Sequence, residues 1–237
     1  MSLERAWRAG ALSAAMFLLA APAICQQTYV TRFDALVGYS YFNSPAIGLP
    51  ENGFQFQFGV RPATWYSVGF DYSNATGDLT LKPSLLPIAL QQQLGAQLAQ
   101  LAALGQIPAG YALTVPAHSE TQTFAVGPQY AYRHFKQVTL FARPSFGAIR
   151  EAAIPNPTDP IAQAIAAELV PSGRKVDWTG FYGFAVGTDL LFSKHFGLRI
   201  QSDLVYDHLF NDLLRNGRYT VRVGVGPCFN FGKNIAE

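Results

Sequence analysis

The sequence predicts an all-β protein that closes into an eight-stranded antiparallel up-and-down transmembrane β-barrel with short helices in two extracellular loops. Three observations predict this fold. Bulky apolar and small polar residues alternate in eight runs after residue 30, as in strands with two different faces. Charged residues make up 14% of the chain, against about 25% in soluble domains. Short and long segments alternate between the runs, as the turns and loops of outer-membrane barrels do.

The N-terminus, residues 1–25, has the composition of a secretory signal peptide. Arg5 and Arg8 precede an apolar stretch at 9–21, which is too short for a spanning helix. Small residues then predict cleavage after Ala23, or two residues later after Cys25. The mature chain is close to neutral, which gives no support for nucleic-acid binding, since that needs a clustered basic surface.

The barrel domain is expected over 30–232, followed by a short C-terminal tail at 233–237. In each of its eight runs, bulky apolar side chains occupy every second position. These runs cover 33–41, 54–61, 66–73, 123–133, 138–147, 182–192, 196–206 and 218–231.

The two faces of the runs indicate which side meets lipid. Apart from a few bulky residues, the second face holds Gly, Ser, Thr, Gln, Asp and Arg but neither Lys nor Glu, whereas a soluble barrel or sandwich would carry Lys and Glu there. The apolar face holds no charge, as lipid contact requires, since a midplane Lys or Arg costs about 2–4 kcal/mol. The apolar set is therefore expected to face outer-membrane lipid, and the polar set a narrow lumen. Aromatics near the run ends, among them Trp65, Tyr132 and Trp178, fit interfacial girdles.

The connections fall into two classes. Those at 62–65, 133–137 and 193–195 are short and predict periplasmic turns. The long ones predict extracellular loops at about 43–52, 74–119, 151–177 and 208–217.

Two of these loops are expected to contain helices. The segment from Pro83 to Ser119 contains no Asp, Glu, Lys or Arg. Leucines recur in it at helical spacing, which predicts a helix at about 85–104. Asp159-Pro160 as a start signal and Pro171 as a stop predict a second helix at about 160–169. We expect the helices to pack against each other above the barrel mouth; the alternative is a surface for a partner or for outer-leaflet lipid.

Hairpin register predicts ion pairs between inward-facing side chains. If Phe192 pairs with Phe196, antiparallel register sets Asp189 opposite Arg199. If Asp207 faces Arg218 in the last hairpin, the same register sets Asp203 opposite Arg222. Pairing Phe42 with Gly53 would set the first Asp opposite an Arg of the second run. The predicted structural pairs in the lumen are Asp34–Arg61, Asp189–Arg199, Asp203–Arg222 and Asp207–Arg218.

Three prolines conflict with a regular barrel. Pro128, Pro144 and Pro227 fall inside presumed strands, where proline removes a ladder hydrogen bond. Bulges or local kinks are expected at these positions. Cys228, on the last strand, is expected to be a lone buried thiol.

No catalytic, cofactor or metal site is predicted. The four histidines are scattered without metal-ligand spacing; they are His118, His134, His195 and His208. His208 has the outward parity that a lipid-deacylating His-Ser arrangement at a barrel rim would use, but position 210 is Phe and no serine lies nearby in sequence. An interfacial polar side chain is the preferred interpretation of His208.

The chain resembles the family of small outer-membrane β-barrel proteins, the OmpA-like transmembrane domain and its relatives in Gram-negative bacteria. The resemblance is carried by 33–41, by Asn52-Gly53-Phe54 and by the closing run 222–231. It implies location in the cell outer membrane and insertion by the barrel-assembly machinery, which recognises a terminal aromatic such as Phe231.

The expected function is that of a non-enzymatic barrel that anchors surface loops, with a role in envelope integrity or surface interaction. Side chains roughly fill the interior of an eight-stranded barrel. A narrow channel for ions or small solutes is one alternative, and an outer-membrane lipid-modifying enzyme is another. The sequence does not define a surface partner.

Overall fold

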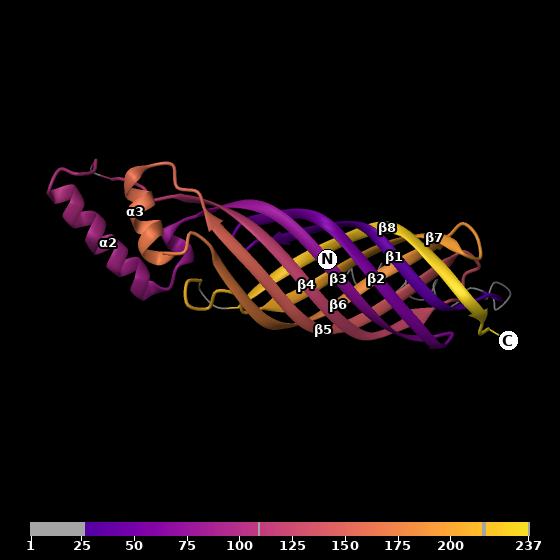
Figure 1. The fold of residues 1–237 in the computed structure, drawn as a ribbon. Helices are drawn as coiled ribbons and strands as arrows, with labels where there is room; N and C mark the ends of the chain where they lie inside the picture. The colour runs from indigo at the N-terminus through magenta and orange to yellow at the C-terminus, as the bar shows by residue number, and fades with distance from the viewer. Residues whose placement is uncertain (1–26, 109, 215–216, 237) are drawn as a thin grey trace, which may run out of the picture.

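The computed structural model describes residues 27–108, 110–214 and 217–236, so the signal peptide, its two cleavage positions and Cys25 lie outside the described residues. Eight antiparallel strands pair in sequence order, and the last pairs with the first to close a barrel (Figure 1). The expected fold class is confirmed. The strands are β1 (Thr31–Ser44), β2 (Leu49–Ala63), β3 (Tyr66–Leu81), β4 (Val115–Tyr132), β5 (Val138–Pro155), β6 (Lys175–Leu191), β7 (Phe196–Asp207) and β8 (Arg218–Asn234).

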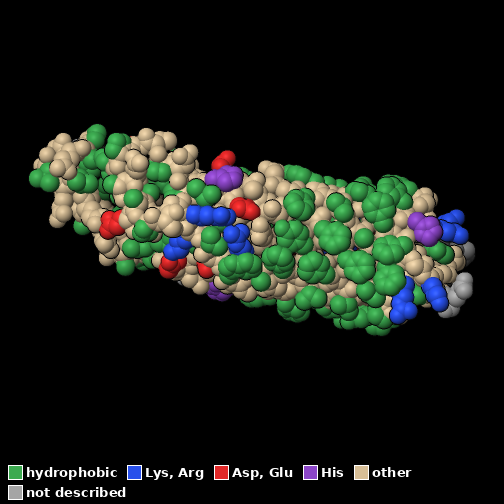
Figure 2. Space-filling model, viewed as in Figure 1, with side chains coloured by type: hydrophobic (Ala, Val, Ile, Leu, Met, Phe, Trp, Pro, Cys, Tyr) green, Lys and Arg blue, Asp and Glu red, His purple; other side chains and the backbone are tan. Residues whose placement is uncertain are grey.

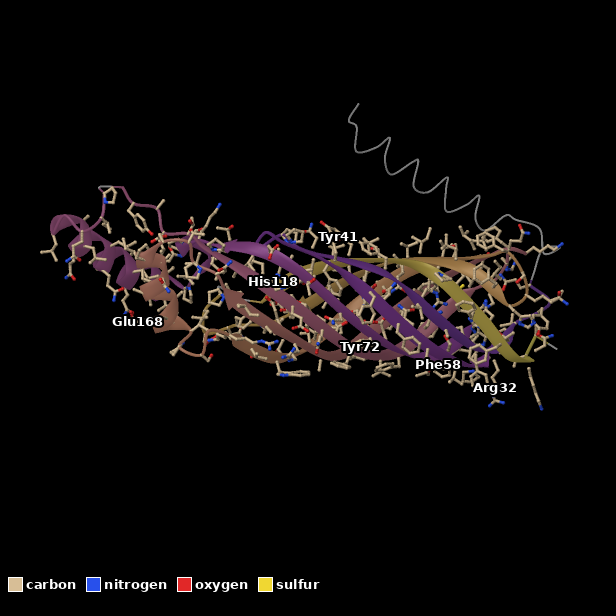
Figure 3. The ribbon with its side chains drawn as sticks, turned by 45° about the horizontal axis from the view of Figure 1, so that its top comes forward. Arg32, Tyr41, Phe58, Tyr72, His118 and Glu168 are labelled. Atoms are coloured by element: carbon tan, nitrogen blue, oxygen red, sulfur yellow. The ribbon has the colours of Figure 1, made fainter. Side chains whose placement is uncertain are left out.

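The wall of the barrel has an apolar outer face and a polar inner face. On β6, Phe184 is 51% exposed, whereas Asp189, of opposite parity, is 1% exposed. Apolar side chains cover the middle of the barrel in Figure 2, and charged side chains gather towards its two ends. Figure 3 shows the rings of Phe58 and Tyr72 on the outside of the wall. The alternation in the sequence therefore marks outside and inside, in the sense that lipid contact requires.

The height of the apolar belt matches a bilayer core. From Phe196 to Tyr206, β7 advances roughly 33 Å at about 3.3 Å per residue. At a strand tilt of about 40° this is roughly 25 Å along the barrel axis, the usual height of such a band. Both terminal side chains are aromatic, and the Tyr206 ring lies 4.7 Å from the Tyr219 ring on β8.

The long connections are shorter than the sequence suggested, because the strands continue past the apolar belt. The connection expected at 74–119 spans 82–114, and the one expected at 151–177 spans 156–174. In the added parts of β3 and β4 the outward residues are polar, as at Thr76 and Glu120. The apolar–polar contrast that marks a strand in lipid disappears there, although the hydrogen-bonded pairing persists.

The prediction for the first connection is wrong. A loop was expected at 43–52, but β1 and β2 are joined by the four-residue turn 45–48, closed by the hydrogen bond from Gly48 N to Pro45 O. Gly48 takes the left-handed φ of 65° that such a turn requires. The tight turn shifts the pairing by two residues, so Phe42 lies opposite Glu51 rather than Gly53.

Two helices form a cap over the loop end of the barrel (Figure 1). In the connection between β3 and β4, the short 3-10 helix η2 (Pro83–Leu85) precedes α2 (Ile88–Ala103). The second helix, α3 (Pro160–Leu169), has the bounds expected from the sequence. Buried Leu94 of α2 packs with Ile165 and Ala166 of α3. No helix in the described part of the chain is long and apolar enough to cross a membrane.

The three strand prolines interrupt the ladder without shifting its register. Between β4 and β5 the pairing stops after Val126↔Phe146 and resumes in the same register at Tyr130↔Ala142, which sets Pro128 opposite Pro144. Placing two residues without N–H groups opposite each other confines the missing hydrogen bonds to one site. The gap beside Pro227, between β8 and β1, also preserves the register. The expected bulges are therefore wrong at these positions, since the register shifts lie near the turn end, at Thr31/Phe33 and Val60/Ala63.

Candidate functional site

The lumen is crossed at mid-height by a closed ring of ion pairs, which we call the central ring: Asp71, Arg143, Asp203 and Arg222. Arg222 lies 2.6 Å from Asp71 and 3.1 Å from Asp203, measured between nitrogen and oxygen atoms. Arg143 lies 3.0 Å and 3.3 Å from the same two carboxylates. Each carboxylate is held between two guanidinium groups, and all four side chains are at most 4% exposed. The ring is formally neutral, which offsets part of the cost of burying charges.

Towards the turn end, Arg199 organises a second layer. Its Nε donates to Asp189 Oδ1 at 2.6 Å, and its Nη2 donates to Asp34 Oδ2 at 2.9 Å. The guanidinium also lies 4.9 Å from the ring centre of Phe141, an aromatic residue on the inner face. Gln57 joins this layer to the central ring, since it accepts from Arg199 at 3.0 Å and donates to Asp71 at 2.6 Å.

Asp34 and Arg61 meet despite the shifted register. Asp34 lies opposite Gly59, not opposite Arg61 as expected. The missing side chain of Gly59 leaves the space that the Asp34 carboxylate occupies. Arg61 reaches Asp34 diagonally, with 3.4 Å between Nη2 and Oδ1.

A third layer closes the lumen near the loop end. Arg218 Nε donates to Asp207 Oδ1 at 3.1 Å, and its Nη2 is paired with Glu151. The Ser119 hydroxyl donates to Glu151 at 3.2 Å. In the same region the Thr121 hydroxyl donates to Glu51 at 2.9 Å. Glu51 and Glu151 lie on the extended parts of β2 and β5, beyond the runs in which the sequence showed no Glu.

Above this layer, apolar side chains fill the barrel mouth. We call this group the mouth cluster; its buried members include Ile47, Leu49, Leu79, Leu209, Phe210 and Leu214. Three of them come from the connection between β7 and β8, which folds into the mouth. The mouth cluster separates the charged lumen from the cap.

The cap is fixed by conventional helix signals. Asp159 is the N-cap of α3, and its side chain accepts from the backbone N–H groups of Ile161 and Ala162 at 3.0 and 2.9 Å. The Tyr111 hydroxyl donates to the same carboxylate at 2.7 Å. The hydrogen bond from Ala162 contributes most to lowering the pKa of Asp159 below its ordinary value, followed by that from Tyr111.

The predicted pairs at 189–199, 203–222 and 207–218 face each other in register, at 2.6, 3.1 and 3.1 Å. Asp71 and Arg143 had the inward parity in the sequence, but pairing across the lumen was not expected. Asp71 lies on β3, three strands away from Arg222 on β8. Hairpin register relates only neighbouring strands, so it carries no signal for contacts across the lumen.

The histidines are not assembled into a site. The His208 ring lies edge-on against Tyr206 at 4.9 Å, and His118 Nδ1 lies 2.8 Å from Asp78 on the outer face. Within residues 27–108, 110–214 and 217–236, no group of His, Cys, Asp and Glu is arranged to hold a metal ion. Cys228 is buried in the wall as a free thiol.

Comparison with known proteins shows similarity in fold but not in sequence. No protein-family model matches the chain, and no curated protein matches it. Among solved structures, Neisserial surface protein A (NspA) aligns with a TM-score of 0.52 at 10% identity, over 84% of this chain and 96% of that one. OprG from Pseudomonas aeruginosa aligns with a TM-score of 0.49 at 9% identity, over 88% of this chain and 100% of that one. Ail of Yersinia pestis aligns with a TM-score of 0.46 at 12% identity, over 85% of this chain and 99% of that one. Together with its closed eight-stranded sheet, the likeness to NspA shows that the chain has the fold of the small outer-membrane β-barrels.

Proposed function

We propose that this protein is a non-enzymatic barrel of the cell outer membrane that anchors a folded cap on the cell surface, where the cap serves envelope integrity or surface interaction. The filled lumen carries the proposal. In the part of the chain that the structure describes, three layers of buried ion pairs and the mouth cluster occupy the interior, and this filling argues against passage of a solute along the axis. A barrel that does not conduct presents its loop end as the part available for function. NspA is by its name a surface protein, which agrees with this proposal.

Conductance in a planar bilayer tests the closed lumen. We expect the purified protein to give no sustained channel currents under conditions in which an open porin, reconstituted in the same way, conducts. Sustained single-channel steps would overturn the closed lumen and favour the narrow channel.

Labelling of intact cells tests the orientation. Ala167 on α3 and Lys194 in the turn between β6 and β7 are both exposed and lie at opposite ends of the molecule. We expect a membrane-impermeant maleimide to label A167C on intact cells, and K194C only after the outer membrane is broken. The unsubstituted protein, labelled in the same way, shows how much maleimide reacts with the natural cysteines. Labelling in the opposite order would refute a cap on the outside.

The absence of catalysis is part of the proposal and has its own test. His208 contacts Tyr206, and within the described residues no hydrogen bond joins its ring to a serine hydroxyl. We expect the wild type and H208A to be equally inactive in lipid deacylase and acyltransferase assays. Activity in the wild type that is lost in H208A would establish the enzyme instead.

A further inference from the structure

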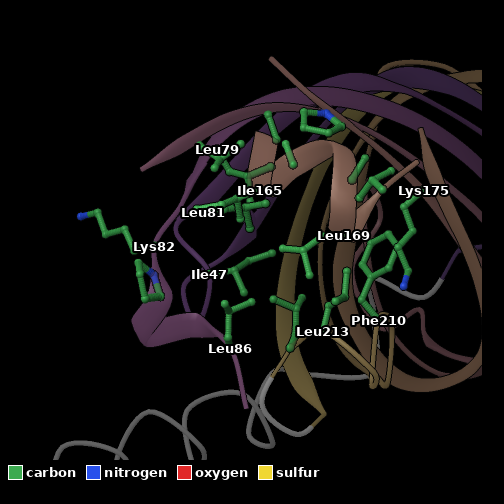
Figure 4. Close-up of a pocket in the computed structure, with 18 of the residues that line it drawn as sticks. Ile47, Leu79, Leu81, Lys82, Leu86, Ile165, Leu169, Lys175, Phe210 and Leu213 are labelled. Atoms are coloured by element: carbon green, nitrogen blue, oxygen red, sulfur yellow. The ribbon is translucent and has the colours of Figure 1, made fainter. Parts of the chain in front are cut away.

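An apolar cavity that is partly open to the surroundings lies between the barrel mouth and the cap, with a volume of about 100 Å³ (Figure 4). The barrel, both helices and the connection between β7 and β8 all contribute to it. Its apolar lining includes Leu79, Leu94, Leu113, Ile165, Ala166 and Phe210.

Two neighbouring residues of α3 with side chains of different size line the cavity on the side of the cap. Ile165 and Ala166 are neighbouring buried residues of α3 that both line the cavity. Ile165 fills its side with a branched chain, whereas Ala166 contributes one methyl group. Leu94 approaches from α2 and Phe210 from the β7–β8 connection, where its backbone takes a left-handed φ of 54°. A side chain in that strained conformation is held by its surroundings, which argues for a defined cavity wall.

The charged residues at the edge of the cavity do not provide a site for a charged ligand. Glu151 is paired with Arg218 in the third layer of the lumen, and Lys175 is paired with Asp212. The Lys82 side chain points away from the labelled apolar residues in Figure 4. An ionic headgroup in the cavity would therefore lose its hydration without gaining a free partner, at a cost of several kcal/mol.

We propose that this cavity is a binding site for one small, uncharged, apolar molecule of about the size of a benzene ring. An engineered apolar protein cavity of comparable size, about 150 Å³, binds benzene or xenon. Burial of the ligand's apolar surface drives binding, at roughly 25 cal/mol per Å². The ion-pair layers below close the route through the barrel, so the ligand enters and leaves at the loop end. The site retains its ligand and does not conduct it.

Xenon and benzene are the probes, and substitutions on α3 supply matched variants. A166F places a ring in the cavity, whereas A167F places the same ring on the exposed face of the same helix. Binding is measured as the xenon-129 chemical-shift change and as benzene saturation transfer, at equal detergent concentration for all variants. We expect saturable binding in the wild type and A167F, and at least a tenfold loss of affinity in A166F. Absence of saturable binding in the wild type, or equal binding in A166F and A167F, would overturn the proposal.

A second variant, which enlarges the cavity instead of filling it, keeps the test valid if A166F does not fold. L94A enlarges the cavity without adding a polar group. We expect L94A to bind both probes and to accept toluene more tightly than the wild type does. If A166F fails to fold, unchanged binding of xenon, benzene and toluene in L94A would place the probes elsewhere and refute the assignment. Conductance is a separate readout, so failure of this site leaves the closed lumen to be judged independently.

Discussion

Replacement of Arg222 by Met tests whether the central ring holds the barrel together. R222M retains a flexible, unbranched stem but removes the guanidinium group and its charge, and it deletes four hydrogen bonds from that group to Asp71 and Asp203. Arg143 still contacts both carboxylates, so one positive charge remains between two negative ones. Removing one partner from a buried ion pair costs about 3–5 kcal/mol, because the remaining charge stays buried. With a urea m-value near 2 kcal/mol/M, this corresponds to a fall in the unfolding midpoint of about 2 M.

Reversible urea unfolding in lipid vesicles, followed by tryptophan fluorescence, measures the loss. The double variant R222M/D71N removes one charge of each sign and leaves the Arg143–Asp203 pair at 3.3 Å. We expect it to be more stable than R222M alone. The matched control is R174M, which breaks the partly exposed Arg174–Glu120 pair outside the lumen and should change stability by less than about 1 kcal/mol. If R222M is as stable as R174M, or if D71N makes R222M less stable, the ring does not act as a coupled unit.

Three further predictions concern the wall and the cap. F184K, on the lipid face, should destabilise the barrel by about 2–4 kcal/mol, and T76K, above the belt, should leave the same urea midpoint almost unchanged; equal losses would contradict the assignment of the belt. G127A should prevent barrel formation, seen as loss of heat-modifiable mobility on gels, because its methyl group would collide with the carbonyl oxygen of the facing strand. G95A, in the open middle of α2, should instead stabilise the helix by about 1 kcal/mol. The folded pKa of Asp159 is depressed, so its contribution to α3 is present above the ordinary carboxyl pKa and is lost as pH falls through the folded value. The protection factors for amide exchange at the start of α3, which correct for the intrinsic pH dependence of exchange, should therefore fall on acidification in the wild type but not in D159N, and an equal fall in both would refute the capping role.

The alternation of residue types predicted the strands because lipid and lumen impose opposite demands on neighbouring residues. This contrast holds only within the belt. Beyond it, outward Thr76 and inward Ala75 no longer differ in the way that lipid requires. The strand ends were therefore interpreted as loops. The helix at Pro160–Leu169 was predicted within its observed bounds because its start and stop signals are local.

The lumen was predictable only where contacts are local. The turn at 192–195 fixed the pairing of Asp189 with Arg199, because a short connection leaves few alternative registers. The first hairpin was displaced by two residues because the tight turn at 45–48 was interpreted as a longer loop. The pairing of Asp71 with Arg222 depends on barrel closure and on the strand stagger across the lumen, which no short segment of sequence encodes.

The continuation of β3 beyond the belt determines how far from the membrane the cap stands. From Asn74 to Leu81 the strand rises roughly 23 Å at about 3.3 Å per residue, or about 18 Å along the axis at a tilt of about 40°. The headgroup region outside each side of the hydrocarbon core is only about 5–8 Å deep. The barrel thus acts as a stalk that lifts α2 and α3 clear of the headgroups. In the orientation proposed above, a macromolecule in solution would contact the cap without contacting lipid, and the polar wall beneath the cap, which includes Glu120 and Arg174, would lie above the headgroups.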